Sequence, residues 1–99
     1  MERRSIKRIL ERKGLTNFQV RVLLATYSIP QGRTATYKEI AKRAGYPNAY
    51  RAVGSVMRVN PLAPTIPCHR VIRSDGSLGN YSNGGTKTKM LMLKREHAI

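Results

Sequence analysis

The apolar positions of this 99-residue chain recur every three or four residues over most of its length, which is the spacing of amphipathic helices. In the first two segments they are Ile6, Ile9 and Leu10, then Val20, Leu23, Leu24 and Tyr27. Gly14 ends the first segment, and Thr16 with Gln19 has the form of a capping box that begins the second. We therefore predict a basic helix over residues 4–13 and a second helix that ends before Pro30.

Two shorter helices are predicted in the middle of the chain. Thr36 and Glu39 form a second capping box, and Gly45 closes the helix that it begins. A further helix spans residues 48–58 and carries Ala52, Val53, Val56 and Met57. Two short helices joined by a tight turn have the shape of a helix-turn-helix, although plain helical hairpins share that shape.

The pattern changes after residue 59. Three prolines between Asn60 and Pro67 predict a rigid extended loop. Residues 69–73 alternate as a short strand, and Asp75-Gly76 predicts a hairpin turn to a partner strand near residues 77–78. A last basic helix is predicted over residues 86–96, with Met90, Leu91 and Leu93 facing the core. The expected fold is mostly α with a small β-hairpin, a winged-helix-like helix-turn-helix domain.

The net charge of the chain indicates the class of partner that it binds. The chain has 19 Lys and Arg against 5 Asp and Glu, a formal net charge of +14. A one-sided excess attracts polyanions, and the chain has no long amphipathic membrane helix, so nucleic acid is favoured over a membrane as partner. No apolar run approaches the roughly 20 residues that cross a bilayer, and the first residues are too charged for a signal peptide. We expect a single domain over residues 1–99 in the cytoplasm, associated with the nucleoid.

Cys68 is the only cysteine, and it stands between Pro67 and His69. It cannot form an intramolecular disulfide, so it is a structural residue, a metal ligand or a nucleophile. Zinc usually takes four ligands, and the chain offers one Cys and two His, so no metal is predicted. As a nucleophile, Cys68 would need His69 to take its proton through a water molecule and Glu96 to orient the imidazole. A buried structural cysteine remains the commoner interpretation of the pattern alone.

The stretch IPCHRVIRSDGSLGNYSNGG, residues 66–85, resembles the active-site signature of the O6-alkylguanine-DNA alkyltransferases. Residues 17–64 resemble the DNA-binding region of that family in order and spacing, so the resemblance covers about residues 16–96. It implies a partner, double-stranded DNA containing O6-alkylguanine bound through its minor groove. It also implies a single transfer of the alkyl group to Cys68 by a monomer, with no cofactor.

The resemblance also implies roles for other residues. Around the acceptor Cys68, these are His69 as base through water, Glu96 to orient His69, Asn60 to fix the loop, and Tyr37 to assist the leaving guanine. Toward DNA, they are Arg51 as the finger that fills the gap left by the flipped nucleotide, with Tyr37, Ala49, Tyr50, Ala52, Gly54 and Ser55. The residues expected to line the substrate pocket are Met57, Tyr81 and Ser82. Without the resemblance, Tyr37 would be only a first-turn helix residue and Arg51 only a phosphate contact.

The chain departs from the family in three respects. A basic helix within residues 1–15 is expected where family members carry an N-terminal domain. One extra residue lies between Tyr81 and Glu96, and Tyr50 adds a large ring beside Arg51. The length matches the alkyltransferase-like proteins, which bind the same lesions without transfer and commonly carry tryptophan in place of the cysteine. Because Cys68 is present, transfer is favoured over lesion sensing, and a small winged-helix regulator would leave the PCHR motif unexplained.

Overall fold

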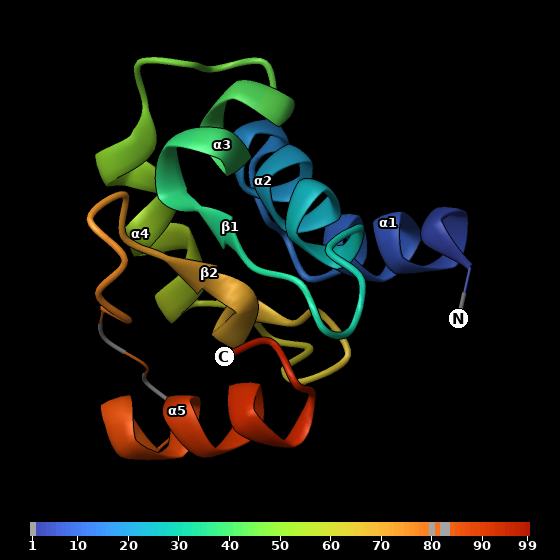
Figure 1. Cartoon of the computed structure of the whole chain (residues 1–99). Helices are drawn as coiled ribbons and strands as arrows, with labels where there is room; N and C mark the ends of the chain where they lie inside the picture. The colour runs from blue at the N-terminus through green and yellow to red at the C-terminus, as the bar shows by residue number, and fades with distance from the viewer. Residues whose placement is uncertain (1, 80, 82–83) are drawn as a thin grey trace.

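The computed structural model describes residues 2–79, 81 and 84–99. That part of the chain forms helices α1 (Arg3–Arg12), α2 (Asn17–Tyr27), α3 (Tyr37–Arg43), α4 (Tyr50–Arg58) and α5 (Gly85–Arg95), with strands β1 (Ala35–Thr36) and β2 (Val71–Ile72) (Figure 1). Helix α2 packs against α1 on one side and against α3 and α4 on the other. The predicted mostly α fold is confirmed. No helix in the described part is long and apolar enough to cross a bilayer.

Both predicted capping boxes are present. The Thr16 hydroxyl accepts a hydrogen bond from the Gln19 amide at 3.2 Å, and the Gln19 side chain accepts one from the Thr16 amide at 2.8 Å. Thr36 and Glu39 repeat the arrangement at the start of α3. Such caps satisfy backbone N–H groups that have no partner inside the helix. The second box thereby fixes Tyr37 as the first residue of α3.

The predicted β-hairpin is wrong, because β2 pairs with β1 instead. The two strands are parallel, with Ala35 opposite Val71 and Thr36 opposite Ile72. The turn at Asp75-Gly76 does form, since the Arg73 amide donates to the Ser77 carbonyl at 2.9 Å. Residues 77 and 78 are not a strand, however. The carbonyl of Leu78 accepts a hydrogen bond from the side chain of Lys89, so it is used by a contact to α5 and not by a ladder.

The segment before β2 also differs from the prediction. Residues 61–66 form a series of turns, not an extended loop, and the Ile66 amide donates to the Leu62 carbonyl at 2.9 Å. His69 and Arg70 were expected in a strand, but they belong to a 3-10 turn, Cys68–Arg70. In a strand, His69 and Arg70 would point to opposite faces. The 3-10 turn lets both side chains reach Glu96 at the end of α5.

Helix α5 turns a different face inward from the one predicted. Leu93 is fully buried, but Met90 and Leu91 are 40% and 48% exposed. The second inward position is occupied by Lys89, which is only 1% exposed. Its ammonium donates to the carbonyl of Val71 at 2.6 Å and to that of Leu78, so a charged residue replaces the expected apolar one.

Candidate active site

Cys68 lies at the base of a cleft of about 660 Å³ and is 4% exposed. Helix α4 supplies one wall of this cleft through Tyr50, Arg51, Gly54, Ser55, Met57 and Arg58. The other lining residues are Tyr37 of α3, Arg73 after β2, Tyr81, and Gly85 and Thr86 at the start of α5. The thiol is therefore enclosed by protein on most sides and faces a space large enough for a purine and its substituent.

The cleft brings together most of the residues predicted for the site. Ala49 and Ala52 belong to the same region of α4 without lining the cleft. His69, Glu96 and Asn60 also do not line it. His69 follows Cys68 in the 3-10 turn, Glu96 binds His69, and Asn60 binds the segment before Cys68. Ser82 lies outside the described residues. Among the described residues, no three His, Cys, Asp or Glu side chains lie together as metal ligands.

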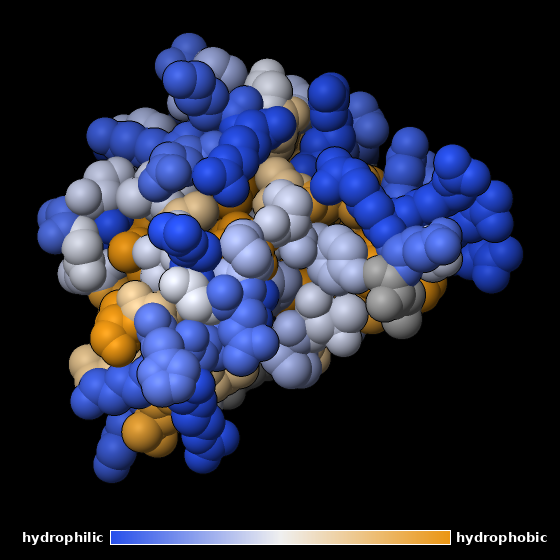
Figure 2. All heavy atoms as spheres, turned by 45° about the vertical axis from the view of Figure 1, so that its right-hand side comes forward, coloured by the Kyte–Doolittle hydropathy of each residue, from blue (hydrophilic) through white to orange (hydrophobic). Residues whose placement is uncertain are grey.

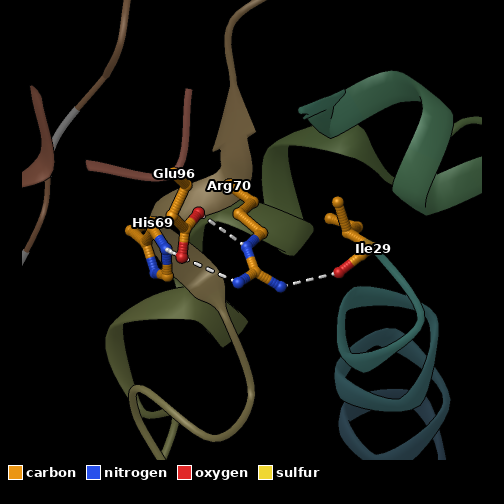
Figure 3. Close-up of polar contacts among 4 residues, drawn as sticks. All are labelled: Ile29, His69, Arg70 and Glu96. Carbon is orange, nitrogen blue, oxygen red and sulfur yellow. Dashed lines mark hydrogen bonds and ion pairs between the residues drawn. The ribbon is translucent and has the colours of Figure 1, made fainter. Parts of the chain in front are cut away.

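His69 is 2% exposed and is hydrogen-bonded to Glu96 (Figure 3). Its Nε2 lies 3.0 Å from Glu96 Oε2, and because an ionised carboxylate can only accept, Nε2 carries the proton of this bond. The other ring nitrogen, Nδ1, is buried and has no hydrogen-bond partner among the described residues. A neutral imidazole held in this tautomer keeps a lone pair on Nδ1, so that atom is able to accept a proton.

Arg70 holds the same carboxylate, and the sequence analysis did not single it out. Its Nε donates to Glu96 Oε1 at 2.9 Å and its Nη2 donates to Oε2 at 2.7 Å, the two-pronged geometry that suits a carboxylate. Its Nη1 also donates to the Ile29 carbonyl at 2.8 Å (Figure 3). The hydrogen bonds from Arg70, and after them the one from His69, lower the pKa of Glu96. Glu96 is therefore ionised when it orients His69.

Asn60 ties the end of α4 to the turn that carries Cys68. Its Nδ2 donates to the Ile66 carbonyl at 2.9 Å, and its Oδ1 accepts from the Leu62 amide at 3.0 Å. The same Ile66 carbonyl also accepts from the amide of Cys68 at 2.9 Å. One carbonyl oxygen thus joins the position of the thiol to that of α4.

Tyr37 and Lys89 approach each other beside the thiol. The Lys89 ammonium lies 5.9 Å from the centre of the Tyr37 ring. Burial raises the pKa of Tyr37, although Arg73 nearby acts in the opposite direction. Burial also lowers the pKa of Lys89 to about 8. Lys89 was missed because its partners are backbone carbonyls, which leave no signal in a sequence.

Gly79 allows the close approach of the chain to Tyr37. Its φ of +74° lies in the left-handed region, and a Cβ there would lie 3.1 Å from the Tyr37 hydroxyl. Both the backbone conformation and the space therefore favour glycine. A side chain at residue 79 would press on the phenol that faces the cleft.

The mouth of the cleft is basic and carries one exposed ring. The Arg51 guanidinium lies 6.0 Å from the centre of the Tyr50 ring, and the Lys38 ammonium lies 5.3 Å from it. Gly54 lies next to them on α4, and a Cβ at this position would point into open space. The absence of a side chain there lets another molecule approach the helix backbone closely. This combination of cations and small residues suits close contact with a nucleic-acid backbone.

Comparison with known proteins gives matches over most of the chain. The domain family described as 6-O-methylguanine DNA methyltransferase, DNA binding domain, matches residues 17–98. The chain is 53% identical over 81 residues to the methylated-DNA--protein-cysteine methyltransferase of Methanosarcina barkeri, an alignment that covers 82% of this chain and 51% of that protein. The chain thus spans about half the length of this relative.

Two solved structures have the same fold. One is Mycobacterium tuberculosis OGT in complex with DNA, with a TM-score of 0.81 and 45% identity, covering 85% of this chain and 52% of that one. The other is S. pombe Atl1 in complex with damaged DNA containing O6-carboxymethylguanine, with a TM-score of 0.73 and 31% identity, covering 83% of this chain and 77% of that one.

The pairing of Glu96 leads to a pH-dependent stability. We expect Glu96→Gln to lower the free energy of unfolding at pH 7 by about 1–3 kcal/mol, because it breaks charge-assisted hydrogen bonds of a largely buried group. The pKa of Glu96 is lowered in the folded state, so its contribution is present above the ordinary value of 4.5 and is lost as the pH falls through the folded value. Urea denaturation curves of the two proteins should therefore converge in acid.

The matched control is Glu39→Gln, which removes an exposed carboxylate paired with Arg43 at 3.7 Å. That change should alter stability by less than about 1 kcal/mol, as surface ion pairs do. Equal effects of the two substitutions at pH 7 would contradict a structural role of the Glu96 carboxylate.

Proposed function

This chain belongs to the 6-O-methylguanine DNA methyltransferase family, and on that premise we propose that it repairs duplex DNA by moving an alkyl group from the O6 atom of guanine to Cys68. The observation that carries the proposal is a thiol at the base of a purine-sized cleft, next to a histidine that is oriented by an ionised carboxylate. The steps below follow from the positions of these groups.

Activation of the thiol begins at His69. Its Nδ1 takes the proton of Cys68 through one water molecule, because Nδ1 makes no direct hydrogen bond to the thiol. The imidazolium that forms is stabilised by Glu96, whose charge is maintained by Arg70. The thiolate is produced inside the cleft, where the ammonium of Lys89 and the guanidinium of Arg73 supply positive charge.

The thiolate then attacks the carbon attached to O6. An S–C bond forms and the C–O6 bond breaks, and the electron pair of that bond leaves with guanine. The purine takes up one proton, which Tyr37 donates from the edge of the cleft. Its raised pKa keeps the phenol protonated at neutral pH, and the phenolate is neutralised by the proton that His69 holds. Atoms and charge therefore balance without any other reactant.

The reaction occurs once for each protein molecule. The product is a thioether on Cys68, and a thioether S–C bond is not hydrolysed at neutral pH because a thiolate is a poor leaving group from saturated carbon. Burial of the thiol limits its oxidation before it meets a substrate.

Access to O6 requires the nucleotide to leave the duplex. Unstacking costs a few kcal/mol, and Arg51 at the mouth of the cleft offsets part of this by entering the stack. Ala49, which precedes α4, and the small residues Ala52, Gly54 and Ser55 of α4 let this helix lie in the minor groove. Tyr50, beside Arg51, offers a ring that stacks on an exposed base.

Lesion binding without transfer is the alternative function. The match to S. pombe Atl1 is the reason to consider this alternative. The chain is 31% identical to Atl1 and 53% identical to the methyltransferase of Methanosarcina barkeri. The thiol of Cys68 at the base of the cleft favours transfer, because a sensor of the lesion has no use for an activated nucleophile.

Mass spectrometry separates the two functions. After incubation with duplex DNA containing O6-methylguanine, we expect the intact protein to gain the mass of one methylene, located on Cys68 by peptide mapping. Cys68→Ala should bind the duplex and gain nothing. An unchanged mass together with tight binding of the lesion would show that the protein is a sensor.

The role of Arg51 is tested by comparing two substrates. Arg51→Ala should slow transfer from duplex DNA by about ten-fold or more, since each 1.4 kcal/mol of lost compensation is a factor of ten. It should leave transfer from free O6-benzylguanine nearly unchanged, because the free base needs no flipping. Arg33→Ala removes an exposed charge away from the cleft and serves as control. Equal loss with both substrates would contradict the finger role.

A further inference from the structure

A second hollow, of about 510 Å³, lies between α1, α2 and the C-terminal end of α3. Four cationic side chains line it, namely Arg3, Lys7, Arg21 and Arg43. None of its lining residues belongs to the cleft of Cys68. We call it the α1–α2 groove.

The groove concentrates positive charge without a counter-charge inside it. No carboxylate is among the described residues that line it. Glu39, which is not a lining residue, pairs with Arg43 at 3.7 Å. Cations held together in this way repel each other, and a bound anion relieves that repulsion.

Three of the four cations are held in place by contacts of their own. Arg3 donates to the Leu24 carbonyl at 3.0 Å. The Arg21 guanidinium lies 5.7 Å from the centre of the Tyr46 ring, and Arg43 pairs with Glu39. Because these side chains are already ordered, an anion that binds them loses little of its affinity to their immobilisation.

The floor of the groove is aliphatic. Its apolar lining residues are Val20, Leu24, Ala25 and Ala44, and in the part of the chain that the structure describes no aromatic side chain lines it. Single-stranded nucleic acids are usually bound by stacking bases on aromatic rings, which this floor lacks. Guanidinium groups above an aliphatic floor suit phosphates joined by deoxyribose.

The exposed surface of α1 continues the charge of the groove. Two of its three isoleucine and leucine residues, Ile6 and Leu10, are fully buried against the core, and Ile9 is partly buried, so the helix lacks the wide exposed apolar face of a membrane-binding helix. Figure 2 shows hydrophilic side chains covering the side of the molecule that carries α1. In Figure 1 this helix lies across α2 from α4, so its charges are separate from the mouth of the cleft.

We propose that the α1–α2 groove binds the sugar–phosphate backbone of duplex DNA outside the lesion-binding face of α4. The proposal rests on the proposed function, which makes duplex DNA the polyanion that the protein meets. Asn17 and Ser28, at opposite ends of α2, both line the groove, so it runs about 17 Å along this helix. That length accommodates successive phosphates of one strand, and each bound phosphate releases counterions and adds affinity without regard to sequence.

The test compares two variants of equal charge. The groove variant combines Lys7→Gln, Arg21→Gln and Arg43→Gln. The control variant combines Lys13→Gln, Lys94→Gln and Arg95→Gln, which are exposed and line neither hollow. The dissociation constant for an undamaged 30-base-pair duplex (about three turns at 10–10.5 base pairs each) is measured over a range of salt concentrations.

The groove variant should bind at least about ten-fold more weakly than the control at low salt. Its plot of log affinity against log salt should be shallower by about 2.7, since three phosphate contacts are lost and each removes about 0.9 from the slope. The slope for the single variant Lys7→Gln should be shallower by about 0.9. This variant keeps the test valid if the triple variant does not fold. Equal slopes for the groove and control variants would overturn the proposal.

Free O6-benzylguanine separates this proposal from the proposed function. Both variants should transfer the benzyl group at the wild-type rate, because the groove shares no residue with the cleft. A slow rate in the groove variant alone would show that the two sites are not separate and would overturn the proposal. Absence of transfer in the wild-type protein would overturn the proposed function, while the comparison of slopes still decides on the groove.

Discussion

Glu96 accepts hydrogen bonds on both oxygens, from the fork of Arg70 and from the imidazole of His69. The carboxylate lies at the end of α5, whereas its partners lie in the 3-10 turn that begins with Cys68. Arg70 extends the connection to the Ile29 carbonyl, just after α2. This cluster therefore holds three distant segments of the chain together, and it sets the orientation of the histidine that follows Cys68.

The second constraint on the site is the burial of Lys89. Its ammonium binds the carbonyls of Val71 and Leu78, which joins α5 to β2 and to the segment after the turn. Burial of a charge is unfavourable, and the lowered pKa of Lys89 shows that cost. A lysine at this position brings positive charge close to Tyr37 and Cys68, where the proposed reaction develops negative charge. The side chain of Lys89 thus both connects α5 to β2 and supplies positive charge near the thiol.

The features that the sequence predicted are those that depend on local hydrogen bonds. Thr16 and Thr36 begin helices because their hydroxyls bind amides three residues away, and this spacing can be read directly. The parallel pairing of β2 with β1 joins residues 36 positions apart, so nothing near Val71 indicates its partner. The hairpin prediction failed for that reason. Met90 and Leu91 were misplaced because the pattern assumes that apolar residues take the inward positions, and here Lys89 takes one of them.

The candidate site was predictable where a motif carries it. Cys68, His69 and Glu96 were named from the PCHR motif and from the resemblance to a family, and the structure brings His69 and Glu96 into contact. Arg70 stands in the same motif but was passed over, since its role depends on a 3-10 turn that the alternating pattern did not indicate. The α1–α2 groove could not be predicted from the sequence either, because Lys7, Arg21 and Arg43 come from three helices and are adjacent only in the fold.

The central claim is that the carboxylate of Glu96 fixes the tautomer of His69 and leaves Nδ1 able to accept a proton. The most direct test is the ¹⁵N chemical shift of the two ring nitrogens of His69, measured by NMR on the full chain while the imidazole is neutral. The account predicts that Nε2 carries hydrogen and that Nδ1 has the shift of an unprotonated nitrogen. A neutral ring with its hydrogen on Nδ1 would contradict it.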